Sequence, residues 1–255
     1  MRKNRTAMLT LAAAALVSAM LHAPVALAQA DTPPQCFAVD YDFAGASWRP
    51  SDGAVDGIRA PINMVRDGLL CAGSQSLGND FVSPWIGIED HNSHGITQIG
   101  FDHSWGPDGN PRYCRFWATG IGMPHDYDCG ADPNGTTVYF RVETYESADN
   151  TYYKVYDCGV SGFSNPCTIK NAGTRAYSNA YASAASETNH GCASYMQGST
   201  SDKVTFGNSL WRLDGNDGSG WGARTWALIN TRCTGDYSAA ITSNGVSTWD
   251  TRNSS

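Results

Sequence analysis

Glutamate and lysine are scarce in this sequence. Of the 24 acidic residues only four are glutamate, namely Glu89, Glu143, Glu146 and Glu187. A shortage of glutamate and lysine disfavours long surface helices, and an excess of aspartate favours turns and loops. Because there are so few glutamates, each can be considered in turn as a catalytic carboxylate.

Several motifs that mark common enzyme classes are also absent. No C-x-x-C pair is present, which argues against a zinc site built from closely spaced cysteines. The chain has no G-x-S-x-G elbow, no H-E-x-x-H helix and no glycine-rich phosphate loop. His91 and His94 beside Glu89 or Asp90 are a weaker metal candidate, and the loop 214–220 lacks the spacing of an EF-hand. We therefore expect no metal and no cofactor.

Long apolar runs are missing after residue 30. The one uncharged apolar run, residues 7–21, follows three basic residues and precedes small-x-small sites ending at Ala28 and Ala30. It is shorter than the ~20 residues that span a bilayer. We predict that residues 1–30 are a cleaved signal peptide and that the mature protein is secreted and extracellular, without a membrane anchor.

All eight cysteines follow the predicted signal peptide. They are Cys36, Cys71, Cys114, Cys129, Cys158, Cys167, Cys192 and Cys233. An even number of cysteines in an exported chain predicts disulfides, here four. The sequence leaves the pairing open, and our expectation is that nearest neighbours pair: 36–71, 114–129, 158–167 and 192–233.

The charge balance excludes some partners. Without the signal peptide the chain keeps 14 basic and 24 acidic residues, a net charge of −10. Nucleic acid and anionic membranes are therefore poor partners. The remaining residues, 31–255, contain no long linker and no internal repeat, so we predict one domain and a monomer.

Short alternating runs separated by glycine, asparagine and aspartate turns fill the mature chain. Asn134-Gly135 and Asn244-Gly245 are hairpin signals. This pattern predicts an all-β fold, an antiparallel two-sheet β-sandwich of the concanavalin-like or jelly-roll type. The alanine-rich segment 176–187 is ambiguous. It is either a helix or a strand that places Tyr181, Ser183 and Glu187 on one face.

The predicted strand 96–105 has two unlike faces. Bulky side chains such as Ile99 and Phe101 form one face, which we expect to pack on the core. The other face carries Gln98, Gly100 and Asp102, and glycine there allows a ligand or another backbone to approach closely. That face is either a functional groove or an ordinary solvated strand surface.

Two neighbouring motifs favour the groove. Trp85-Ile86-Gly87-Ile88-Glu89 is followed by Gln98-Ile99-Gly100-Phe101-Asp102. This arrangement resembles the catalytic sheet of the glutamic peptidases (eqolisins) and, more distantly, the neprosin-type peptidases. The similarity covers about residues 81–158 and includes the aromatic run that ends at Trp117. It implies that Gln98 is a catalytic residue and that Trp85, Glu89, Asp102 and Trp117 contact the substrate.

The second catalytic residue of that family is a glutamate in an A-E-W-I-x-E context on a later strand. The best match here is Glu187, in the segment 182–187, although the tryptophan of the motif is absent. The resemblance thus implies a secreted, acid-active endopeptidase in which a Glu/Gln dyad activates water. A glutamate with a pKa near ~4.3 would accept the proton, and the glutamine would hydrogen-bond the oxyanion.

A second interpretation remains open. The same features fit a non-catalytic secreted β-sandwich that binds a glycan or a surface protein instead of cleaving a polypeptide substrate. Tryptophan-rich sandwiches can present aromatic side chains to a sugar, although most tryptophans simply pack in cores. The two interpretations differ in whether Gln98 and Glu187 point into one groove with their head groups within hydrogen-bond or one-water reach.

Overall fold

The computed structural model describes residues 41–48, 55–65, 70–71, 80–90, 95–120, 124–130, 133–147, 150–174, 180–207, 210–213, 221–222, 225–229, 231–243 and 245–253. The predicted signal peptide, Cys36, His91, His94 and the loop 214–220 lie outside these residues. Within these ranges no helix is long and apolar enough to cross a membrane.

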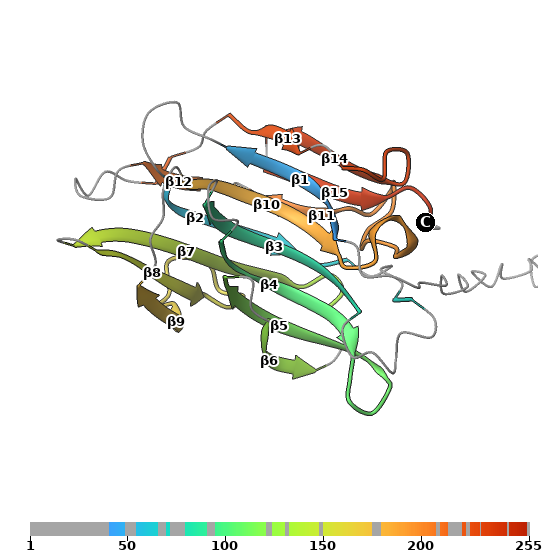
Figure 1. Cartoon of the computed structure of the whole chain (residues 1–255), viewed down its shortest axis with the longest axis horizontal. Coiled ribbons are helices and arrows are strands. Elements are labelled where there is room, and N and C mark those ends of the chain that lie inside the picture. Colours follow the sequence, from blue (N-terminus) through green and yellow to red (C-terminus); the bar gives the residue numbers. More distant parts are fainter. Residues whose placement is uncertain are drawn as a thin grey trace, which may run out of the picture. The chain divides into compact units, whose positions relative to one another are not determined.

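Seven strands form the first sheet, which we call the site sheet. Their order is β13 (Ala227–Ile229), β1 (Asp42–Trp48), β10 (Ala180–Thr188), β3 (Phe81–Asp90), β4 (Ile96–Trp105), β5 (Pro111–Thr119) and β6 (His125–Gly130). Figure 1 shows these strands running side by side in this order. Strands from distant parts of the chain are therefore neighbours, since β10 lies between β1 and β3.

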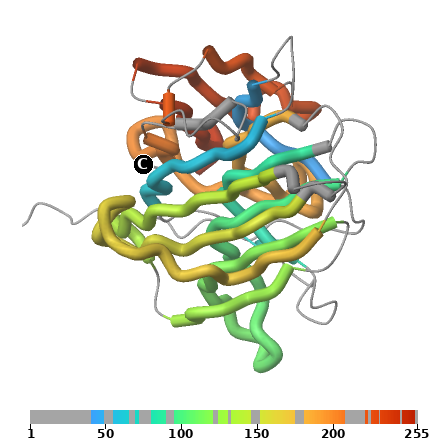
Figure 2. Tube along the Cα trace, turned by 90° about the vertical axis from the view of Figure 1, so that its left-hand side faces the viewer, coloured from blue at the N-terminus to red at the C-terminus, as the bar shows by residue number. Residues whose placement is uncertain are grey.

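The second sheet, which we call the cover sheet, has eight strands. Their order is β14 (Tyr237–Thr242), β15 (Gly245–Asp250), β11 (Val204–Gly207), β2 (Val55–Asn63), β7 (Thr137–Ser147), β8 (Asn150–Asp157) and β9 (Thr168–Thr174), with β12 (Leu210–Leu213) also pairing with β2. Figure 2 shows β2, β7 and β8 side by side in this sheet. Every pairing between named strands is antiparallel, which confirms the predicted two-sheet β-sandwich.

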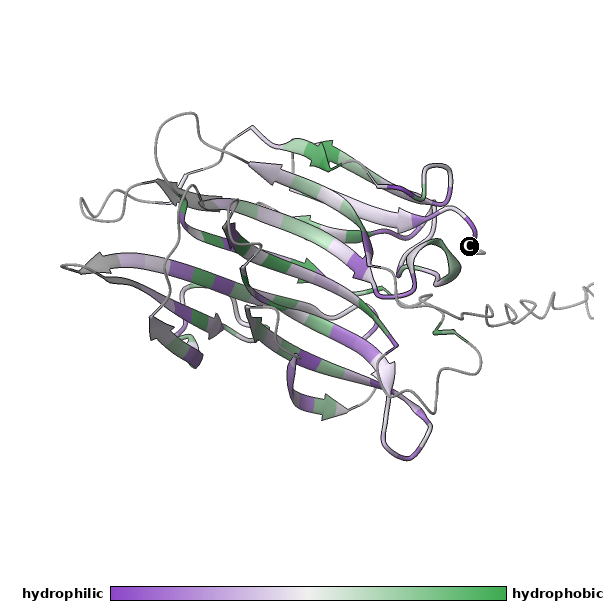
Figure 3. Ribbon diagram, viewed as in Figure 1, coloured by the Kyte–Doolittle hydropathy of each residue, from purple (hydrophilic) through white to green (hydrophobic). Residues whose placement is uncertain are grey.

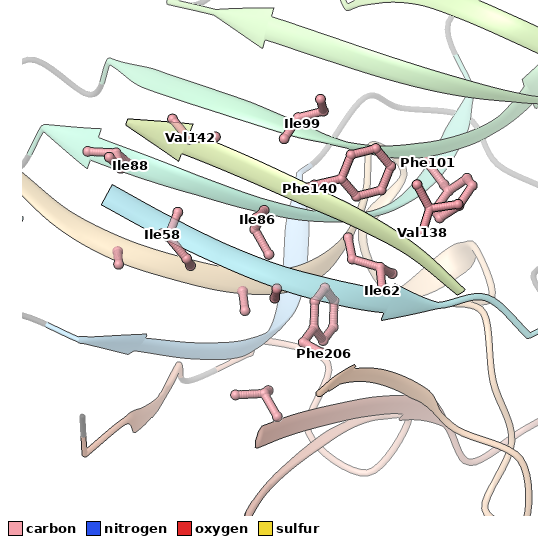
Figure 4. Close-up of a cluster of buried hydrophobic side chains, with 14 of the residues drawn as sticks. Ile58, Ile62, Ile86, Ile88, Ile99, Phe101, Val138, Phe140, Val142 and Phe206 are labelled. Carbon is pink, nitrogen blue, oxygen red and sulfur yellow. The ribbon is translucent and has the colours of Figure 1, made fainter. Parts of the chain in front are cut away.

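The main core fills the space between the two sheets (Figure 4). Ile86, Ile88 and Ile99 from the site sheet meet Ile58 and Phe140 from the cover sheet, and all five are fully buried. Because side chains alternate along a strand, the neighbours of these residues point to the opposite face of each sheet. Figure 3 shows this alternation as green and purple bands along several strands.

The ambiguous alanine-rich segment is a strand over its described part. Residues 180–188 form β10, with Ala182 and Ala184 buried in the main core. Small side chains suit this position, because β10 is paired on both edges and lies under the cover sheet. The strand interpretation is therefore confirmed, and it places Tyr181, Ser183 and Glu187 on the face away from the core.

Three of the predicted disulfides are present. Cys114 pairs with Cys129, Cys158 with Cys167 and Cys192 with Cys233. Cys71 is also disulfide-bonded, and the described residues contain no free cysteine. Nearest-neighbour pairing is thus confirmed for these three pairs, whereas the expected pairing of Cys71 involves Cys36, outside the described residues.

The Cys192–Cys233 disulfide is expected to contribute most to stability of the three, because it closes the longest loop, with a sequence separation of 41 residues against 9 for Cys158–Cys167. In the chain-entropy account, replacing both Cys192 and Cys233 by serine lowers the free energy of unfolding by about 4 kcal/mol. The matched Cys158 and Cys167 double variant loses only about 2.5 kcal/mol. Urea unfolding of both variants checks this order, and a larger loss for the short loop would contradict it.

Candidate functional site

The outer face of the site sheet, turned away from the core, carries the predicted site residues other than Trp117 in rows set by strand register. Glu187 on β10 pairs with Ser83 on β3, and two residues further along β3, Trp85 lies between Ala185 and Gly100. The next row joins Ser183, Gly87 and Gln98. The following row joins Tyr181 and Glu89.

Trp85 is held by a small apolar cluster on this face. It packs with Phe116, Ala118 and Ala185 and is only 4% exposed. Gly100 makes this packing possible, because a Cβ atom there would collide with the Pro84 carbonyl oxygen and lie 2.7 Å from the Trp85 Cα atom. The close approach that we predicted at Gly100 is therefore that of the adjacent strand β3, with Trp85.

The fixed indole positions the Glu187 carboxyl group. The Nε1–H group of Trp85 donates to the Glu187 Oε2 atom at 2.9 Å. Burial raises the pKa of Glu187 to about 7; the tryptophan hydrogen bond acts in the opposite direction, and the repulsion of Glu89 adds to the effect of burial. A carboxyl group that titrates near neutrality and is oriented by a rigid donor can accept or deliver a proton.

Glu89 lies at one end of an open trough. The Tyr181 hydroxyl donates to its Oε2 atom at 2.7 Å. The trough has a volume of about 510 Å³ and is lined by Phe43, Ser47, Trp48, Glu89, Tyr181, Thr225, Ala227, Leu228 and Ile229. Sequence reasoning named Glu89 as a substrate contact but missed the trough, because β13 and β1 join β10 only through long-range pairing.

Two buried polar atoms belong to the residues that pair with Gly87 from its two sides. Neither the Ser183 Oγ atom nor the Gln98 Oε1 atom has a hydrogen-bond partner among the described residues. Ser183 is fully buried, whereas Gln98 keeps part of its surface accessible. Buried polar atoms are nearly always paired in native proteins, so this row marks a position for a polar group of a ligand or a water molecule.

Gln98 and Glu187 share the outer face but not a row. The register places them two strands and four residues apart, which in a flat sheet is roughly 16 Å between Cα atoms. The residue of β10 level with Gln98 is Ser183, a position that the sequence comparison did not single out. The two head groups therefore make no direct pair. The row between them carries Trp85, paired with Ala185 and Gly100, so the register does not bring the two head groups within one-water reach.

Asp102 lies below the surface of the same face. Its carboxylate accepts hydrogen bonds from Ser83 Oγ at 3.0 Å and Ser104 Oγ at 2.5 Å, and the residue is 3% exposed. Burial raises its pKa to about 7, against the effect of the serine hydrogen bonds. Its carboxylate is occupied by these neighbours, so the described contacts give Asp102 a structural role in place of the predicted substrate contact.

Trp117 belongs to the opposite face of the site sheet. It pairs with Ile99, packs against the main core and stacks on His125 with ring centroids 4.1 Å apart. The residue of β5 that faces the site is its neighbour Phe116. The structure therefore does not bring Trp117 together with the other predicted substrate contacts.

Among the residues that the structure describes, two clusters have the composition of a metal site. They are Asp42 with Cys192 and Cys233, and Cys71 with Asp80 and His190. All three cysteines are disulfide-bonded, so none offers the thiolate that ligates a metal. Asp42 in addition accepts hydrogen bonds from the Cys233 backbone and from Thr231. Both clusters therefore act as structural contacts.

Comparisons with family models, with curated proteins and with solved structures found no match for this chain.

Proposed function

We propose that this protein is a secreted endopeptidase in which Glu187 accepts a proton from the attacking water and Gln98 binds the carbonyl oxygen of the scissile peptide bond. The observation that carries the proposal is the placement of both side chains on one face of the site sheet, with Glu187 oriented by Trp85. The resemblance of the Trp85–Glu89 and Gln98–Asp102 motifs to the glutamic peptidases supports a polypeptide substrate. The predicted signal peptide and the disulfides support secretion.

In this proposal the two residues act on different atoms of the reacting groups. Water between Glu187 and the substrate loses a proton to the carboxylate while its oxygen attacks the carbonyl carbon. The carbonyl oxygen gains negative charge, and the amide Nε2–H group of Gln98 hydrogen-bonds it. Glu187 then returns the proton to the leaving nitrogen as the C–N bond breaks.

The raised pKa of Glu187 changes the expected pH range. An acid optimum follows from an unperturbed glutamate, but burial raises the pKa of Glu187 to about 7. A general base must be ionised, so its activity increases as the pH rises through this value. We therefore expect activity near neutral pH in place of the acid range that the sequence suggested.

Replacing Gln98 by alanine tests the second half of the proposal. We expect kcat/KM for a quenched fluorescent peptide to fall by about 10²–10³, the usual cost of one oxyanion donor. The fold should persist, because Gln98 lies outside the main core. An unchanged kcat/KM in Gln98→Ala would remove Gln98 from the mechanism.

The control for this variant is Thr205→Ala, on β11 of the cover sheet, which should leave kcat/KM unchanged. Gln197 is less suitable as a control, although it is also a glutamine. It is buried, and its side-chain amide donates to the Val82 carbonyl oxygen at 2.9 Å, so its replacement would disturb the fold.

A non-catalytic binding protein is the second candidate, and the trough beside Glu89 favours it. Three of its lining residues, Phe43, Trp48 and Tyr181, are aromatic, and such side chains suit a glycan or an exposed protein segment. Binding of such a ligand without any hydrolysis between pH 3 and pH 9 would support this candidate over the peptidase.

A further inference from the structure

The trough is too long for a single side chain. Phe43 lies level with Glu187 and Tyr181 lies level with Glu89, so the trough residues span six positions of β10, about 20 Å in an extended strand. An extended peptide advances ~3.3 Å per residue, so this length corresponds to about six residues. The trough therefore has the dimensions of a bound polypeptide segment.

The two ends of the trough differ in chemistry. Phe43, Leu228 and Ile229 form an apolar end, and the first two are 36% and 51% exposed. The other end presents the Glu89 carboxylate beside Tyr181, whose hydroxyl group hydrogen-bonds it, whereas Trp48, which also lines this end, packs against the main core. A carboxylate beside an aromatic ring suits a cation, which gains both charge pairing and contact with the ring.

The charges around the trough point to a basic occupant. Glu89 and Glu187 lie on the same face, six positions of β10 apart, and the repulsion of Glu89 contributes to the raised pKa of Glu187, so a bound cation would relieve an unfavourable interaction on this face. The mature chain carries a net charge of −10, which attracts basic polypeptides over a longer range.

We propose that the trough binds an extended polypeptide with a lysine or arginine side chain seated against Glu89. This inference rests on the proposed function and deepens it, since the bound polypeptide would be the substrate on which Glu187 acts. Binding alone can nevertheless be measured in a variant that cannot cleave. The preference for a basic residue can therefore be tested independently of hydrolysis.

The test uses Glu187→Gln protein and two capped hexapeptides of alanine that carry either one arginine or one glutamine at the same position. Isothermal titration calorimetry should show at least about tenfold tighter binding of the arginine peptide, as expected for a charge-assisted contact. Adding Glu89→Gln, which keeps the acceptor for Tyr181 but removes the charge, should reduce this preference to within about twofold. The matched control Glu143→Gln, on the cover sheet, should leave it unchanged.

Three results would overturn the proposal: equal affinity for the two peptides, a preference that survives Glu89→Gln, or argininamide binding as tightly as the arginine hexapeptide. The last result would indicate a site for a small cation. If the arginine preference holds and depends on Glu89 while the wild type cleaves neither peptide, the trough assignment stands and the peptidase proposal fails. If the wild type cleaves both peptides equally and binds them equally, the peptidase proposal stands and the trough assignment fails.

Discussion

Replacing Glu187 by glutamine is expected to lower kcat/KM for peptide hydrolysis by about 10²–10⁴, the usual contribution of a general base. Glutamine keeps the size of the side chain and still accepts the hydrogen bond from the Trp85 indole, so the fold should remain intact. A quenched fluorescent peptide assay measures the loss, and circular dichroism checks that the strand content is unchanged.

Glu143→Gln is the matched control for this experiment. Glu143 lies on β7 of the cover sheet, where it forms an ion pair with Arg141 at 3.6 Å. Its replacement should change kcat/KM by less than about twofold, as for most surface substitutions. Full activity in Glu187→Gln would exclude Glu187 as the base and would make Glu89 the next carboxylate to replace.

The stability of the protein is expected to fall as the pH rises from about 4 to about 8, because the carboxyl groups of the buried Asp102 and the half-buried Glu187 have raised pKa values in the folded protein. In the folded protein burial raises both pKa values to about 7, whereas in the unfolded chain both groups ionise near ~4. The folded state therefore binds more protons than the unfolded state between these values. The stabilisation by these two protonated groups is complete below their pKa in the unfolded chain. It is lost as the pH approaches and passes their pKa in the folded protein.

Asp102→Asn isolates one of the two contributions. A pKa difference of about three units corresponds to on the order of 3–4 kcal/mol at pH 8, so the variant should be more stable than the wild type there and should show a weaker pH dependence. The exposed Asp202 offers a control, since Asp202→Asn should leave the pH dependence unchanged. Urea unfolding at pH 4, 6 and 8 would contradict this account if wild type and Asp102→Asn lost stability equally.

The sequence predicted on which face of its own strand a site residue lies better than it predicted how the strands of the site align with one another. Alternation along 96–105 correctly placed Ile99 and Phe101 in the core and Gln98 on the opposite face. The strand interpretation of 176–187 likewise placed Ser183 and Glu187 on one face. These are local patterns of period two, which a single strand displays by itself.

The register between neighbouring strands, and the face of the sheet to which each residue of β5 points, could not be predicted in the same way. The pairing of β10 with β3 joins residues about 100 positions apart and decides that Ser183, not Glu187, lies level with Gln98. The side on which Trp117 points depends on its pairing with Ile99, because both faces of β5 carry aromatic residues. A shift of one residue in such a pairing exchanges the two faces, and only the assembled sheet specifies it.

The dependence of kcat/KM on pH tests the central claim most directly, because it reports the ionisation of the free enzyme. Wild-type protein should cleave a peptide substrate with kcat/KM rising about tenfold per pH unit below the pKa of Glu187, about 7, and levelling off above it. Absence of cleavage at every pH from 3 to 9, or a kcat/KM that stays constant between pH 5 and pH 8, would contradict a role for Glu187 as the base.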